Sequence, residues 1–130
     1  MKLSSTAAYS LLATAYVAKN QHKGLVVSDD IASRYKIALE YLLKVMQLLV
    51  KANILRSKRG PRGGFSLARK PNKITMLEII EAVQGPLTSD MLLREHAPRE
   101  KFAANAEKAS KKAFNNARST LKAVTLANLL

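Results

Sequence analysis

The sequence of 130 residues contains no cysteine and few acidic residues. The absence of cysteine excludes disulfides, thiol nucleophiles and thiolate metal sites together. Nine Asp and Glu stand against 22 Lys and Arg, so the formal net charge is +13. This charge attracts polyanions, which makes nucleic acid the first partner to consider. The alternative is that the charge only keeps the protein in solution, and motifs must decide between the two.

Long apolar runs are also missing, since no stretch approaches the roughly 18 residues that a membrane span needs. Residues 1–6 lead into an amphipathic pattern and not into the apolar core of a signal peptide. We therefore expect a cytoplasmic protein without a membrane segment. The length allows one compact domain with an appended element.

Apolar residues at helical spacing predict helices over residues 6–20, 28–35 and 39–53. Ser28 is expected to cap the second helix. The third has an apolar stripe on one side and polar residues on the other. Two short helices joined by a tight turn fit a helix-turn-helix, although ordinary helical bundles share this pattern.

Two strand-like segments, 54–58 and 65–69, flank a loop over 59–64 that has three glycines and a proline. A β-hairpin directly after a helix-turn-helix is typical of a wing. Arg59 and Arg62 lie at its tip, where guanidinium groups can enter a DNA minor groove. Further cations expected close to the tip are Arg56, Lys58, Arg69 and Lys70. A phosphate-binding loop is disfavoured because the Gly-Lys-Ser/Thr ending and the following helix are missing.

The second half of the chain is predicted to be helical. Thr75 and Glu78 form a capping box that opens a helix ending at residues 85–86. An alanine-rich segment predicts a long helix over 98–118, and a short one follows in 124–130. Because the apolar stripe of the long helix is too thin for a core of its own, we expect it to pack against a second copy of the chain. Packing back onto its own domain is the alternative.

The wing segment and its surroundings resemble the Rrf-two (Rrf2) family of bacterial transcription regulators. Its members include an iron-sulfur cluster regulator, a nitric oxide sensor and a regulator of cysteine metabolism. The resemblance covers nearly the whole chain. The matching residues are 55–68, 74–75 and 78–86, with 1–4, Tyr9, 30–32, 41–42 and 124–126 also fitting.

The resemblance implies a mainly α fold with a small β-hairpin wing. Residues 1–86 would form the winged helix-turn-helix DNA-binding domain, 87–97 a linker or sensor loop, and 98–130 the dimerisation helices. It further implies a homodimer on a two-fold operator in double-stranded DNA. Each recognition helix would enter a major groove and each wing the adjacent minor groove.

The same resemblance assigns candidate contacts with DNA. Arg59 occupies the position of the family's minor-groove arginine. Positions 38, 40 and 43 read bases in the family's iron-sulfur regulator, and here only Glu40 is polar, able to accept from a cytosine amino group. Ala38 and Leu43 offer at most contact with thymine methyl groups, and residues 6–8 lack the family's basic Lys-Gly-Arg stretch. The expected DNA-contacting set is Arg59, Arg62, Glu40, Lys44, Lys58, Gln47, Tyr41 and Ser28.

Many family members hold an iron-sulfur cluster on three cysteines with five residues between neighbours. Ala97, Ala103 and Ala109 have that spacing here, and a methyl group cannot bind iron, so we expect no cofactor and no metal in this chain. Three explanations stay open: a natural member without a cluster, cysteines changed to alanine, or coincidence in an alanine-rich region. His22 and His96 are too isolated to form a metal site.

A sequence-specific DNA-binding regulator, acting as a repressor, is thus the function that the sequence favours. The alternative is a protein-interaction module regulated by a partner enzyme, as in the cysteine-metabolism branch. Salt dependence separates the two, because only binding to DNA weakens steeply with salt. An enzyme is disfavoured, since neither histidine has an evident acid-base partner and the carboxylates are scattered.

Overall fold

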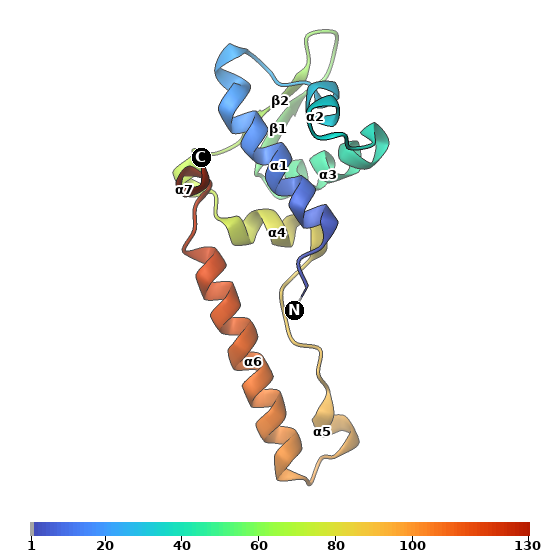
Figure 1. The fold of residues 1–130 in the computed structure, drawn as a ribbon, viewed down its shortest axis with the longest axis vertical. Coiled ribbons are helices and arrows are strands. Elements are labelled where there is room, and N and C mark those ends of the chain that lie inside the picture. Colours follow the sequence, from blue (N-terminus) through green and yellow to red (C-terminus); the bar gives the residue numbers. More distant parts are fainter. Residues whose placement is uncertain (1) are drawn as a thin grey trace.

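The structure is a computed structural model that describes residues 2–130. Its helices and strands are arranged as a compact upper body from which one long helix projects (Figure 1). In chain order they are α1 (Ser5–Asn20), η1 (Gln21–Lys23), α2 (Ser28–Tyr35), α3 (Leu39–Lys51), β1 (Leu55–Lys58), β2 (Gly64–Leu67), η2 (Pro71–Lys73), α4 (Met76–Gln84), α5 (Leu93–His96), α6 (Lys101–Lys122) and α7 (Leu126–Leu129).

The core of the body lies between α1, α3 and α4. The predicted apolar stripe of α3 is confirmed, because it supplies four of the buried side chains. Contacts from α2, the hairpin and α7 close the core, so that residues from both halves of the chain contribute to it. Its largest fully buried members include Ile31, Leu42, Met46, Leu49, Ile54, Ile79 and Leu126.

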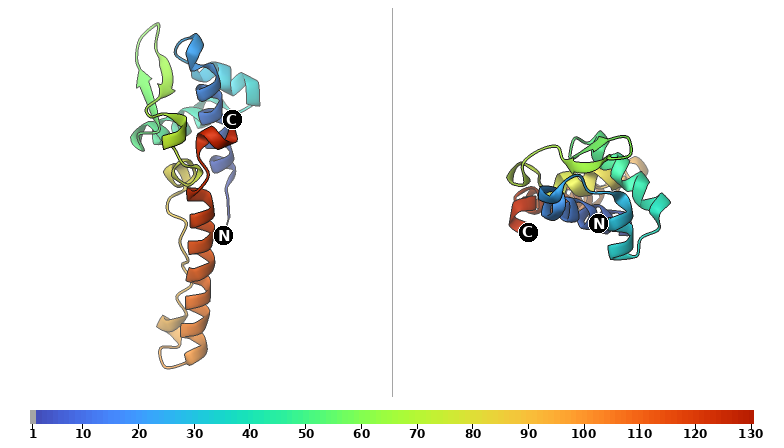
Figure 2. Two further views of the ribbon diagram at one scale, coloured as in Figure 1. Left: turned by 90° about the vertical axis from the view of Figure 1, so that its left-hand side faces the viewer. Right: turned by 90° about the horizontal axis from the view of Figure 1, so that it is seen from above.

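The predicted wing is present as an antiparallel hairpin. Leu55 pairs with Leu67 and Lys58 with Gly64. Val26 extends the sheet by one bridge, because its amide donates to the Phe65 carbonyl at 2.9 Å and its carbonyl accepts from the Phe65 amide at 2.7 Å. Phe65 is buried in the core, which anchors the base of the hairpin while its loop projects beyond the body (Figure 2).

Several predicted boundaries are wrong by a few residues. Ser28 is the first residue of α2 and not its cap, since extended Val27 holds the cap position without a side-chain hydrogen bond. α3 ends at Lys51 because Asn53 adopts a left-handed conformation (φ 59°) that turns the chain into β1. The long helix begins at Lys101, after a turn at residues 98–99, and continues to Lys122. The short helix α5 was not predicted.

The chain returns to the body after α6. The Leu126 amide donates to the Ile74 carbonyl and the Met76 amide to the Val124 carbonyl, both at 2.8 Å. The predicted capping box of α4 is confirmed, and α7 begins with a second box of Thr125 and Asn128. These contacts fix the upper end of α6 to the start of α4. None of the helices in residues 2–130 combines the length and apolar character required to cross a membrane.

Candidate DNA-binding surface

The turn between α2 and α3 is three residues long. Lys36 ends α2 in a left-handed conformation (φ 55°), with its amide donating to the Ala32 carbonyl. Ile37 is buried, and the Ala38 carbonyl accepts the first hydrogen bond of α3 from the Leu42 amide at 2.9 Å. The buried Ile37 fixes the turn to the core, so the first turn of α3 is held at the surface.

The solvent-facing side of α3 carries three of the predicted contact residues. Glu40, Lys44 and Gln47 are exposed and recur three or four positions apart, so they share one face. Exposed Leu43 and Leu48 flank this polar ridge on its two sides. Polar groups able to pair with base edges thus lie next to apolar groups that suit thymine methyls.

Tyr41 is partly exposed but its polar group is engaged within the chain. Its hydroxyl forms a hydrogen bond with the hydroxyl of Thr6. Its ring lies edge-on to that of Tyr9, with centroids 5.6 Å apart. Tyr41 therefore ties the start of α3 to α1. Ser28, also predicted to contact DNA, is half-buried at the start of α2.

The wing tip is exposed throughout residues 59–62, which places Arg59 and Arg62 in solvent, and Lys58 before them is exposed as well. A backbone hydrogen bond of 2.9 Å from Gly63 to the Gly60 carbonyl closes the loop. A Cβ atom at Gly63 would lie 2.1 Å from the Lys58 carbonyl oxygen, a distance that no side chain tolerates. Glycine is therefore required for the two strands to approach each other at the tip.

All charged residues in and around the wing are positive. Residues 53–73 contain seven Lys and Arg and no Asp or Glu. Arg56 and Lys58 are exposed along with the two tip arginines. Lys70 is exposed as well, but it follows β2, which ends at Leu67, so it does not lie near the wing tip as predicted. A concentration of cations on a narrow projection produces a local positive potential that attracts phosphates.

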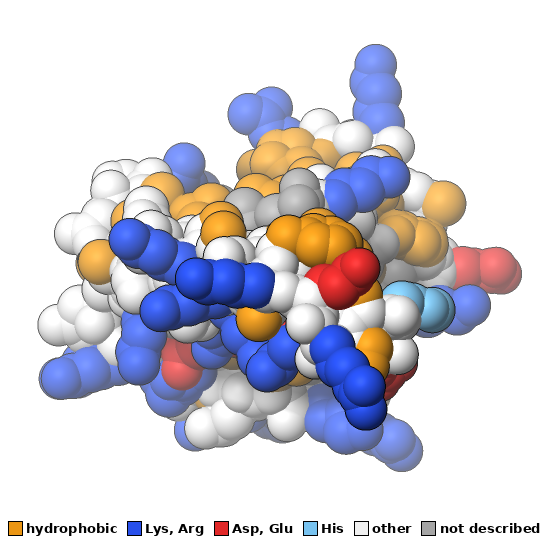
Figure 3. Space-filling model, turned by 90° about the horizontal axis from the view of Figure 1, so that it is seen from below, with side chains coloured by type: hydrophobic (Ala, Val, Ile, Leu, Met, Phe, Trp, Pro, Cys, Tyr) orange, Lys and Arg blue, Asp and Glu red, His pale blue; other side chains and the backbone are white. Residues whose placement is uncertain are grey.

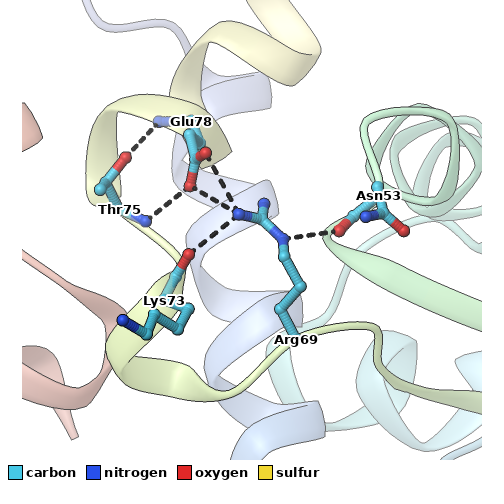
Figure 4. A network of polar contacts seen from close by, with 5 residues as sticks. All are labelled: Asn53, Arg69, Lys73, Thr75 and Glu78. Carbon is cyan, nitrogen blue, oxygen red and sulfur yellow. Dashed lines mark hydrogen bonds and ion pairs between the residues drawn. The ribbon is translucent and has the colours of Figure 1, made fainter.

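Arg69 was expected beside the wing tip, and this prediction is wrong. β2 ends at Leu67, so the chain has already turned back into the body. The Arg69 guanidinium donates to the carbonyls of Asn53 (3.0 Å) and Lys73 (2.9 Å) and forms an ion pair of 3.2 Å with Glu78 (Figure 4). Arg69 therefore joins the end of α3, the exit of the wing and the start of α4.

Glu78 has a double role in this network. Its backbone amide donates to the Thr75 hydroxyl, and its carboxylate accepts from the Thr75 amide at 2.9 Å (Figure 4). Partial burial alone would raise the pKa of Glu78. Hydrogen bonds from Thr75 and Arg69, with the charge of Arg69, outweigh that effect and hold the pKa of this carboxyl below its ordinary value of 4.5.

Gln21 is a second positioning residue that the sequence does not reveal. Its side-chain oxygen accepts from the Leu67 amide at 2.8 Å, which fastens the outgoing strand of the wing to the end of α1. The two residues are 46 positions apart. No local pattern identifies Gln21, because a glutamine after a helix has many ordinary roles.

The residues at the three alanine positions do not fit an iron-sulfur cluster. Ala97 is half-buried after α5, Ala103 is buried in α6, and Ala109 is exposed. At about 100° per residue, Ala103 and Ala109 face directions roughly 120° apart around α6. No group of three His, Cys, Asp or Glu that could hold a metal occurs within residues 2–130.

Comparison with known proteins agrees with this architecture. Residues 3–130 match the profile of the family Rrf2, described as "Iron-dependent Transcriptional regulator". A proposed HTH-type transcriptional regulator of Aquifex aeolicus (strain VF5) is 42% identical over 105 residues, which are 81% of this chain and 72% of that protein. IscR of Aliivibrio salmonicida (strain LFI1238) is 40% identical over 83 residues, 64% of this chain but only 49% of that regulator.

Among solved structures, CymR (YrzC), the global cysteine regulator of B. subtilis, is similar over nearly its whole length. The TM-score is 0.79 at 26% identity, with 99% of this chain and 95% of that one covered. The agreement extends from the wing through α7, so it includes the long helix as well as the helix-turn-helix. The chain therefore belongs to the Rrf2 family of winged helix-turn-helix transcriptional regulators.

Proposed function

We propose that this chain binds double-stranded DNA as a homodimer and represses transcription by occupying a two-fold operator. The observation that carries the proposal is the wing, whose two tip arginines are exposed and whose first strand packs against α3, the helix with the exposed polar face. Both features lie at the end of the molecule away from the turn between α5 and α6 (Figures 1 and 2).

The dimensions of this end suit a duplex. A B-DNA major groove admits an α-helix, and Glu40, Lys44 and Gln47 are the side chains of α3 that would meet base edges or phosphates there. The wing is narrow enough for the adjacent minor groove, where Arg59 and Arg62 would meet the concentrated negative potential. Tyr41 and Ser28 would lie at the margin of this contact.

A second copy of the chain would pack along α6. Phe102, Ala106, Ala109 and Ala113 lie on one side of the helix, and Phe102 is 61% exposed. Small side chains permit close approach of two helices, and Phe102 would be covered in the contact. A two-fold pair would present two recognition helices to half-sites about one helical turn apart.

Binding by this chain is proposed to be independent of a cluster, because the chain has no cysteine and the three positions with the spacing of the family's cluster ligands are alanines. Treatment with an iron chelator should leave the affinity for DNA unchanged. A loss of affinity on chelation, together with iron in the purified protein, would contradict this part of the proposal.

Fluorescence anisotropy with a duplex selected from a random pool tests DNA binding directly. Arg59→Ala should weaken binding by about 10- to 100-fold, as a lost minor-groove contact costs roughly 1–3 kcal/mol. Arg99→Ala, at an exposed arginine in the turn before α6, is the matched control and should bind normally. Equal affinities for the two variants would remove the wing from the interface.

The salt dependence of the same measurement separates this function from a protein-interaction module. For binding to DNA, the logarithm of the association constant must fall linearly with the logarithm of the salt concentration, because bound phosphates release counterions. A flat response would favour docking on a protein partner. In vitro transcription from a promoter that overlaps the selected site then tests repression.

A further inference from the structure

A cavity of about 220 Å³ lies where the segment after α4 runs beside α6. It is lined by residues 87–89 from that segment and by Lys111, Phe114, Asn115 and Arg118 from α6. The cavity is distant from the wing and from the exposed face of α3, so the proposed DNA contact does not account for it. Its volume is below the roughly 300–1,000 Å³ of pockets for drug-sized ligands, so only a small molecule would fit.

One side of the cavity carries positive charge with unused hydrogen-bonding capacity. The Arg118 guanidinium pairs through one nitrogen with Glu81, whose carboxylate also accepts from the Leu87 amide at 2.7 Å. A guanidinium has five N–H donors, so Arg118 keeps donors for a ligand. Lys111 is exposed, and no carboxylate within residues 2–130 lies within ion-pair distance of its ammonium group.

The nearest acidic group along α6 is already engaged elsewhere. The Glu107 carboxylate accepts from the Arg94 amide at 2.7 Å and from its guanidinium at 2.5 Å. These hydrogen bonds hold the pKa of Glu107 below its ordinary value, and the charge of Lys111 makes a smaller contribution. Glu107 therefore stays ionised by its contact with Arg94 and leaves the Lys111 ammonium without a direct partner.

The remaining walls are neutral. Leu87 packs in a small cluster with Ala7, Leu77 and Ile80, and Phe114 is half-buried. The hydroxyls of Thr88 and Ser89 and the amide of Asn115 add polar groups at the rim. An apolar patch next to two cations is the pattern that recognises an organic anion with a short hydrocarbon part.

We propose that this cavity binds a small organic anion. Its carboxylate would pair with Lys111 and Arg118, and its hydrocarbon part would cover the half-buried Phe114, next to the buried Leu87. This site goes beyond the proposed binding of DNA and does not depend on it.

The position of the cavity keeps it open to solutes. Lys111, Asn115 and Arg118 lie about half a turn around α6 from the stripe of Phe102, Ala109 and Ala113, so a second copy on that stripe leaves the cavity uncovered. Seen from the α5–α6 end, Lys and Arg side chains are spread over the surface and Asp and Glu are few (Figure 3). The surrounding potential therefore attracts anions.

Nuclear magnetic resonance of the ¹⁵N-labelled full chain tests the site without DNA. The probes are sodium pentanoate, pentanol (the same chain length without charge) and sodium phosphate (charge without a chain), all at constant ionic strength. Pentanoate should shift the backbone amides of Thr88 and Ser89 and the side-chain amide of Asn115, saturating at about millimolar concentration as expected for a ligand with few atoms. Phosphate and pentanol should bind more weakly.

Lys111→Gln should weaken pentanoate binding by about tenfold or more, because a charge-assisted contact is lost. The matched control is Lys112→Gln, which removes the same charge from an adjacent exposed lysine outside the cavity and should leave binding unchanged. Absence of saturating shifts, or an equal loss in both variants, would overturn the proposal. If pentanol bound as tightly as pentanoate, the cations would have no role in binding. If phosphate bound as tightly as pentanoate, the apolar wall would have no role.

Discussion

The guanidinium of Arg69 lies 3.2 Å from the carboxylate of Glu78, and this ion pair joins the exit of the wing to the first turn of α4. Arg69 also donates to the carbonyl of Asn53 at the end of α3. One side chain thus links the two elements proposed to enter the DNA grooves with the helix that supports them. This link holds the wing relative to α3 together with the contact of Gln21 with Leu67 and the bridge between Val26 and Phe65.

The lowered pKa of Glu78 predicts a pH dependence of stability. Its contribution is fully present above pH 4.5 and is lost as the pH falls through the lower pKa of the folded state. Glu78→Gln should reduce the free energy of unfolding at pH 7 by about 1 kcal/mol, and the deficit should shrink below pH 4.5. Urea unfolding at several pH values measures both effects. Glu95→Gln, an exposed acid in α5, is the control and should show neither.

Gly63→Ala should damage the wing more than its exposure suggests. The new Cβ would lie 2.1 Å from the Lys58 carbonyl oxygen, so the loop must open. We expect about 1–3 kcal/mol of destabilisation and at least tenfold weaker binding of DNA. Pro61→Ala, at an exposed position in the same loop, should change both quantities little. If the two variants had the same stability and the same affinity for DNA, the close approach of the strands at the tip would matter for neither.

A charge on the α6 stripe should dissociate the proposed dimer. Ala113→Glu would bury an unpaired carboxylate between two copies, which costs roughly 3 kcal/mol and raises the dissociation constant of the dimer about 100-fold. Ala104→Glu introduces the same charge at an exposed position on another side of the helix and is the control. Sedimentation velocity over a range of concentrations distinguishes them. If the dimer persisted in Ala113→Glu but dissociated in Ala104→Glu, the contact between the two copies would not lie on the proposed stripe of α6.

Glu40→Ala should relax the sequence preference at one base pair of each half-site. A carboxylate that accepts from a cytosine amino group discriminates by about 1–3 kcal/mol, whereas alanine accepts nothing. Total affinity should change less, because Glu40 also repels nearby phosphates. Binding-site selection with the variant and the unmodified chain measures the preference, with Glu95→Ala as control. An unchanged consensus would exclude Glu40 from base recognition.

The parts of the fold that the sequence predicts are those with strong local signals. The stripe of α3 repeats at helical spacing, the glycine-rich loop indicates a hairpin, and Thr75 with Glu78 forms a capping box three residues apart. Each signal lies within one element. The fold class therefore follows from the sequence without knowledge of tertiary contacts.

The features that sequence analysis misses depend on distant partners. Gln21 contacts Leu67 across 46 positions, and Leu126 fills a core formed by residues before 80. The start of α2 differs from its prediction because it, too, depends on a distant partner. The bridge between Val26 and Phe65 holds the chain extended up to Val27, so Val27 occupies the cap position that a local preference assigns to Ser28.

The attachment of α6 at its upper end makes it a lever. That end is fixed through the contacts of residues 124–126 with the start of α4, whereas the contact of Glu107 with Arg94 joins the lower half of α6 to α5, which lies far below the body (Figure 1). Its 22 residues span about 33 Å at 1.5 Å per residue. A rotation of about 5° at the root would move the far tip by about 3 Å, so a small displacement in one half of the molecule is magnified in the other.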